Sequence, residues 1–144
     1  MTHQSDHRAY FFKLDITIKK IRNALQRRFN EANCDLTVDQ WVLFDNIHRE
    51  PGISQNQLVA LTGKDAPTIT RIIDLLKKKE LVERKSSILD KRKFNLFVNE
   101  KGKDVYCHAV EIVSSIRKKG WGDMKEQDYK NFVRIVDSIY KNFG

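Results

Sequence analysis

The sequence predicts a mainly α-helical protein with one small β-hairpin. Apolar residues recur at steps of three and four over most of the chain, which indicates helices with one buried face. Only two prolines and six glycines interrupt the 144 residues, so the helices should be long. Around residues 94–99 the pattern changes to an alternation at period two, which is typical of a half-buried strand.

The first expected elements are a long helix and a shorter one that follows a polar turn. Leu14, Ile18 and Leu25 belong to an apolar stripe that predicts a helix over about residues 8–33. Thr37, with Gln40 three residues later, forms the pattern of a capping box. The second helix should therefore begin after Thr37 and end before the Pro-Gly pair at 51–52.

Two more helices are expected before the hairpin. Ser54 is placed to cap a short helix that Gly63 closes, and Asp65 is placed to cap the next one, where Pro67 is tolerated in the first turn. The buried face of this fourth helix should consist of four aliphatic residues, Ile69, Ile72, Ile73 and Leu76.

The hairpin and two final helices complete the chain. Leu81 and Val82 begin one expected strand, the alternating stretch at 94–99 forms the other, and the turn between them carries Asp90, Lys91 and Arg92. The last two helices are expected at about residues 101–119 and 125–142, with a break around Trp121.

Helix, short helix, helix and hairpin in this order predict a winged helix-turn-helix over residues 37–100. The flanking parts, residues 1–36 and 101–144, are expected to be dimerisation helices within the same compact domain. Their apolar stripes are larger than one small core can cover, and a second copy would bury them. The alternative is a monomer that folds its terminal helices onto itself. The residues expected in the dimer interface are Phe11, Leu14, Ile18, Phe132, Val136, Ile139 and Phe143.

Charge favours a polyanionic partner. The formal net charge is +8, and residues 64–103 carry twelve Lys or Arg against six Asp or Glu, so most of the excess lies around the hairpin. On the fourth helix, residues 67, 71, 74 and 78 should point outward, flanked by threonines at 68 and 70. Such a helix fits the major groove of DNA, where Arg71 can bond a guanine edge. A merely solvated helix face is the alternative.

The hairpin tip supports the DNA interpretation. Arg92 is placed to enter the minor groove, and Asp90 is placed to pair with Arg92 and hold its guanidinium outward. The alternative is a solvated turn with a surface ion pair worth about 0–1 kcal/mol.

Other classes of protein find less support in the sequence. No apolar run reaches the roughly 20 residues of a membrane span, and the first ten residues lack the order of a secretory signal, so a cytoplasmic, nucleoid-associated protein is expected. Cys34 and Cys107 form no Cys-x-x-Cys pair, and the four histidines show no metal-ligand spacing. No nucleophile–base pair or phosphate loop stands out, so neither an enzyme nor a cofactor is expected.

The central residues resemble the MarR (multiple antibiotic resistance regulator) family of bacterial transcription factors. The likeness is carried by Leu-Val-Glu-Arg at 81–84, Asp-Lys-Arg at 90–92 and Asn-Glu-Lys-Gly at 99–102, and it extends through nearly the whole chain. One position departs from the family pattern, because Glu80 stands where a glycine is usual. The left-handed backbone conformation costs glycine little free energy, but it costs other residues about 1 kcal/mol. The sequence therefore does not determine where the fourth helix ends or the angle of the wing.

The resemblance implies an obligate homodimer that binds a palindromic operator, with one recognition helix and one wing in each half-site. By position, it assigns DNA contacts to thirteen residues: Ser54, Gln55, Asn56, Pro67, Thr68, Thr70, Arg71, Lys78, Arg84, Lys85, Asp90, Lys91 and Arg92. The expected function is a transcription regulator, most often a repressor.

The resemblance also implies a signal that releases the protein from DNA, either a small aromatic ligand or cysteine oxidation. Cys34 lies just past the predicted end of the first helix, so a redox-sensing regulator that uses Cys34 is an alternative, and a plain free thiol is favoured. A winged-helix protein-interaction module without DNA binding is a second alternative.

Overall fold

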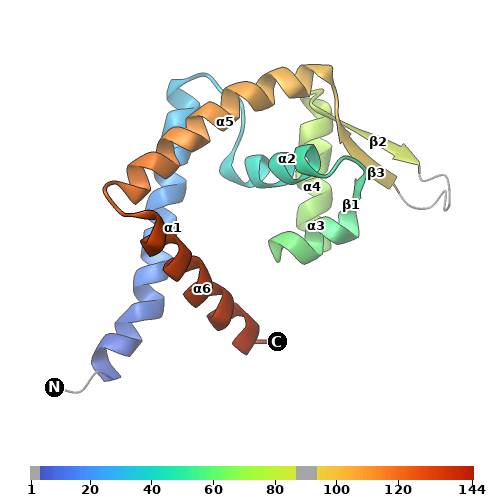
Figure 1. The fold of residues 1–144 in the computed structure, drawn as a ribbon. Coiled ribbons are helices and arrows are strands. Elements are labelled where there is room, and N and C mark those ends of the chain that lie inside the picture. The colour runs from blue at the N-terminus through green and yellow to red at the C-terminus, as the bar shows by residue number, and fades with distance from the viewer. Residues whose placement is uncertain (1–3, 87–93) are drawn as a thin grey trace.

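The computed structural model describes residues 4–86 and 94–144, and side chains from residue 10 onward. Six helices and three strands form these parts, and Figure 1 shows their arrangement. In chain order they are α1 (Gln4–Glu31), α2 (Val38–Arg49), β1 (Ile53–Ser54), α3 (Gln55–Thr62), α4 (Ala66–Lys78), β2 (Val82–Ser86), β3 (Phe94–Val98), α5 (Glu100–Trp121) and α6 (Glu126–Asn142). This order confirms the mainly helical fold with a small hairpin.

The expected helix caps are present. Thr37 accepts a hydrogen bond from the Gln40 amide at 3.0 Å, and the Gln40 side chain accepts one from the Thr37 amide at 3.2 Å, which completes a capping box. Ser54 caps α3 in the same reciprocal manner, and Gly63 ends that helix with a φ of 70°. These local signals fix where α2 and α3 begin.

The sheet contains one strand that the sequence did not predict. β2 and β3 form the expected antiparallel hairpin, with Val82 opposite Val98 and Arg84 opposite Leu96. β1 pairs with the other edge of β3, where Ile53 lies opposite Leu96, so the strand order is β1-β3-β2. A two-residue strand carries no detectable alternation, which explains why only its Ser54 cap was predicted.

One core joins the helix-turn-helix, the sheet and parts of the long helices. Phe44, Ile73 and Leu96 are fully buried in it, and α1 and α5 contribute Phe29 and Ala109. All four aliphatic residues predicted for the inner face of α4 are buried. We call residues 25–86 and 94–113 the body.

The turn from α4 into β2 contains the departure noted in the sequence. Glu80 has a φ of 62°, the left-handed conformation in which glycine is less strained. Its carbonyl accepts a hydrogen bond from the Asn99 side chain at 2.7 Å, while the same side chain caps α5 by accepting from the Gly102 amide at 2.8 Å. A Cβ on Gly102 would lie 2.2 Å from the Leu81 carbonyl oxygen, so the glycine permits this close approach. The hydrogen bond from Asn99 therefore fixes the turn at the end of α4, although position 80 is a glutamate and not a glycine.

The terminal segments differ from the body. On the left of Figure 1, the first half of α1 and the whole of α6 extend away from the body. α5 continues to Trp121, two residues beyond its expected end, and the Trp121 ring packs against Tyr129 and Phe132 at centroid distances of 5.1 and 5.8 Å. We call residues 10–21 and 126–144 the arms.

Across the described residues, no helix combines the length and the apolar character that crossing a membrane requires.

Candidate nucleic-acid interface

The outer face of α4 is the centre of the candidate interface. Asp65 caps the helix by accepting a hydrogen bond from the Thr68 amide at 2.8 Å, which also lowers the pKa of the Asp65 carboxyl. The aliphatic residues of α4 occupy the core, so the remaining positions face solvent. One side of α4 is thus buried in the core, and the other side is available for contact with a partner.

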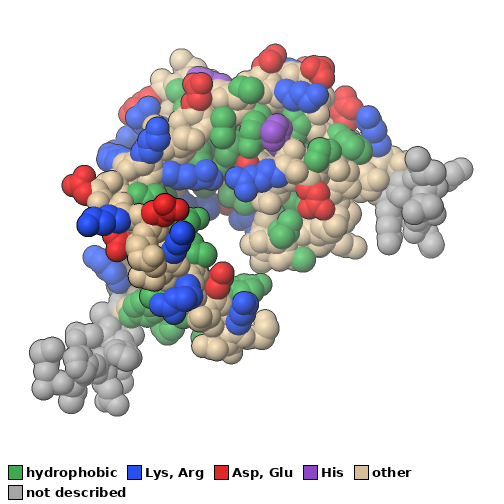
Figure 2. Space-filling view, viewed as in Figure 1, with side chains coloured by type: hydrophobic (Ala, Val, Ile, Leu, Met, Phe, Trp, Pro, Cys, Tyr) green, Lys and Arg blue, Asp and Glu red, His purple; other side chains and the backbone are tan. Residues whose placement is uncertain are grey.

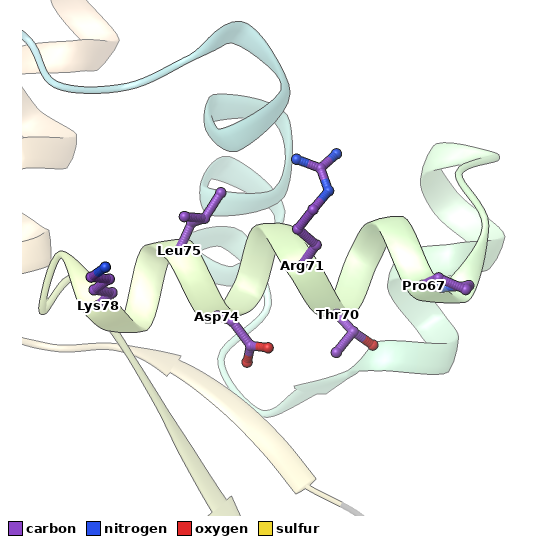
Figure 3. Close-up of a pocket in the computed structure, with 6 residues that line it drawn as sticks. All are labelled: Pro67, Thr70, Arg71, Asp74, Leu75 and Lys78. Atoms are coloured by element: carbon purple, nitrogen blue, oxygen red, sulfur yellow. The ribbon is translucent and has the colours of Figure 1, made fainter.

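The available side forms an open groove of about 510 Å³. Its lining residues are Pro67, Thr70, Arg71, Asp74, Leu75 and Lys78, shown in Figure 3. Arg71 and Leu75 project to one side of the helix, whereas Thr70 and Asp74 project to the other. Arg71 and Lys78 are both exposed, and the salt bridges between described residues include neither of them.

The start of α3 lies beside this face. The Gln55 side-chain amide donates to the Thr70 hydroxyl at 3.1 Å, and Thr70 donates in turn to the Ala66 carbonyl at 3.1 Å. Asn56 is exposed, and the Ser54 hydroxyl is occupied by its capping bond. Gln55 and Thr70 therefore form one polar surface contributed by two helices.

The base of the hairpin is tied to α4 by a pair that sequence spacing did not indicate. Arg84 Nη2 donates to Asp74 Oδ1 at 2.9 Å, and the Arg84 side chain is only 21% exposed. Arg84 Nε is buried and has no hydrogen-bond partner among the described residues. Lys85 Nζ lies 4.8 Å from the centre of the Phe97 ring. Direct DNA contact by Arg84 or Lys85 stays a prediction.

The predicted hairpin tip belongs to the segment between β2 and β3. Asp90, Lys91 and Arg92, with the proposed Asp90–Arg92 brace, lie outside the described residues. The strands that lead to them are placed by the five residue pairs between β2 and β3.

The arms carry the residues expected in a dimer interface, and most of them are exposed. Phe11 is 56% exposed, Phe132 is 47% exposed and Phe143 is 82% exposed. Ile18 and Val136 are also exposed, while Leu14 and Ile139 are half-buried. Figure 2 shows apolar side chains on the surface of the part that α1 and α6 form. The arms therefore present an apolar face that nothing within the described chain covers.

Cys34 lies in the turn after α1 and is buried. Burial is the main cause that raises the pKa of its thiol; the Asp35 carboxylate adds to the effect and Lys79 opposes it. A raised pKa disfavours the reactive thiolate.

Comparison with known proteins finds a family model that matches the central part of the chain. Residues 35–93 match the family model described as MarR family. A crystal structure of MarR is 25% identical to this chain, with a TM-score of 0.74, and the likeness covers 90% of this chain and 86% of that one.

Two further structures share the fold at lower identity, and both are named as DNA complexes. A putative MarR family transcriptional regulator from Listeria monocytogenes, complexed with 26mer DNA, is 21% identical with a TM-score of 0.83, covering 92% of this chain and 87% of that one. The S. aureus MepR–DNA complex is 15% identical with a TM-score of 0.82, covering 92% of this chain and 97% of that one. The family match and the shared fold agree with the motifs at 81–84 and 99–102. The chain therefore has a winged helix-turn-helix fold, and its residues 35–93 are similar to the MarR family of transcription regulators.

Proposed function

We propose that this chain is a homodimeric, sequence-specific DNA-binding regulator that places α4 in the major groove and the hairpin in the minor groove. The observation that carries the proposal is the solvent-facing side of α4, where Thr70, Arg71 and Lys78 line one open groove. Arginine gives the commonest specific contact to guanine, and lysine suits phosphate. The two similar proteins solved with DNA support this use of the fold.

Symmetry supports the dimeric part of the proposal. A two-fold pair joined through the exposed apolar arms would present two α4 helices, one for each half of a palindrome. Thr68, Asn56 and the tip residues Lys91 and Arg92 complete the proposed contact surface. The proposed location of such a regulator is the cytoplasm, in association with the nucleoid.

The repressor role and its release by a small aromatic ligand come from the family resemblance. The alternative signal, oxidation of Cys34, is less favoured because that thiol is buried and its pKa is raised. A protein-interaction module would not need the exposed cations of α4, which favours the DNA-binding function over that alternative.

Selection of bound sequences from random double-stranded DNA tests the proposal. We expect a palindrome to be recovered, and we expect Arg71→Ala to weaken binding to it by about 1–3 kcal/mol and to relax the choice at one base pair in each half-site. Arg117→Ala, which removes an exposed cation from α5, is the control and should leave that choice unchanged. All binding is compared at one salt concentration. Recovery of no preferred sequence would contradict the proposal.

A further inference from the structure

A single carboxylate oxygen joins three separate elements of the molecule. Asp39, in the first turn of α2, accepts from Arg22 of α1 at 2.6 Å and from Lys64 of the α3–α4 turn at 2.9 Å. Both bonds end on the same atom, Asp39 Oδ1. The two cations are 17 and 25 residues away in the sequence, so the contact exists only in the folded chain.

The position of this junction relates the arm to α4. Arg22 directly follows Ile21, the last residue of the arm, and Lys64 directly precedes Asp65, the residue that caps α4. Two ion pairs through Asp39 therefore connect the residue that follows the arm with the residue that precedes the cap of α4. The N-terminal end of α4 carries Pro67 of the candidate interface.

The other polar contact between α1 and the start of α2 does not extend this far. Gln26 donates to the Leu36 carbonyl at 3.1 Å and accepts from the Val38 amide at 3.0 Å, which attaches α1 only to the turn before α2. Asp39 adds the connection to the turn before α4. Its removal would also leave the Arg22 and Lys64 cations facing each other without an anion between them.

We infer that Asp39 is a positioning residue that fixes α4 relative to the dimer arm and so selects the half-site spacing that the dimer accepts. The inference rests on the proposed function, because spacing has meaning only for a dimer on a two-part site. Asp39 touches no DNA in this account. Its neutral replacement should change which spacings are bound, and the choice of bases within a half-site should stay the same.

The test compares Asp39→Asn with wild type on the recovered palindrome and on versions with one or two base pairs inserted at its centre. We expect wild type to prefer one spacing and Asp39→Asn to lose about two- to thirtyfold of that preference. The control is Asp15→Asn, which removes a carboxylate from a salt bridge to Lys19 that lies wholly within α1. It should keep the wild-type preference.

Two further measurements separate positioning from general damage. Asp39→Glu retains the charge and should restore part of the spacing preference, and amide hydrogen exchange of residues 63–68 should become faster in Asp39→Asn than in Asp15→Asn. If Asp39→Asn loses its helical signal, Arg22→Gln replaces it, with the same expected loss of preference.

The outcomes distinguish this inference from the proposed function. A wild-type protein that prefers one spacing, with Asp39→Asn and Arg22→Gln preferring it equally, overturns the inference and leaves the proposed function standing. A wild-type protein that recovers no palindrome overturns both.

Discussion

The body and the arms differ in how far they bury the same types of apolar residue. In the body, the aliphatic and aromatic side chains pack into one core, and the large apolar residues left exposed among its described parts are Leu61 and Phe94. In the arms, α6 has no buried residue, although phenylalanine, valine and isoleucine recur along it. Burial of apolar surface is the main favourable term in folding. The body therefore buries most of its own apolar residues, whereas the arms leave theirs on the surface, where the proposed dimer would cover them.

The largest expected effect is a cavity in the body. Phe44 is fully buried, so Phe44→Ala should lower the free energy of unfolding by about 3–5 kcal/mol, measured by urea denaturation. The same substitution at Phe143, which is 82% exposed, should cost less than about 1 kcal/mol. Equal losses at the two positions would mean that the body and the end of the arm do not differ as described.

A charge placed on the arm should act on association. Phe132→Glu should weaken the self-association of the proposed dimer by about 2 kcal/mol or more, because the exposed face of α6 would then bury a carboxylate. Sedimentation velocity over a range of protein concentrations measures this change. Phe94→Glu is a matched control, since Phe94 is 43% exposed and Phe132 is 47% exposed, but Phe94 belongs to the body. If both variants stay dimeric, the dimer does not use the face of α6 that carries Phe132.

Strain in the body offers a smaller effect of opposite sign. Glu80 has a positive φ, so Glu80→Gly should raise the free energy of unfolding by about 0.5–1 kcal/mol. Its side chain gives up only an exposed contact to Lys101 at 3.5 Å, which is worth little. Glu83→Gly, on an exposed position of β2, should instead lower stability. Both values come from the same denaturation measurement.

Local signals made most of the body predictable from the sequence. Thr37 and Gln40 predict the start of α2, and Ser54 and Gly63 predict the two ends of α3, because helix caps depend on residues only a few positions apart. The inner face of α4 follows from the period of its aliphatic residues.

The contacts that join distant residues were not predictable in this way. Arg84 lies ten residues beyond Asp74, and Arg22 lies 17 residues before Asp39, at separations set by tertiary packing. Strand β1 is too short to show a period, and it pairs with β3, which follows α3, α4 and β2 in the chain. The apolar stripes of the arms were visible in the sequence, but only the structure shows that the arm residues remain on the surface.

The smallest expected effect concerns the junction between the two regions, tested by acid. The hydrogen bond from Lys64, followed by the contact with Arg22, lowers the pKa of Asp39, while partial burial opposes them. A carboxyl with a lowered pKa in the folded state stabilises that state above the pKa of the unfolded chain. This contribution is lost as the pH falls through the pKa that Asp39 has in the folded state.

Wild type should therefore exceed Asp39→Asn in stability near pH 6, and the difference should shrink toward about pH 3, as urea denaturation at each pH would measure. Because Asp39 is 43% exposed, solvent screens the pairs and the difference should be smaller than those above. Asp15→Asn serves again as the control, and a difference from wild type that stays constant with pH at Asp39 would show that its charge does not hold the arm to the body.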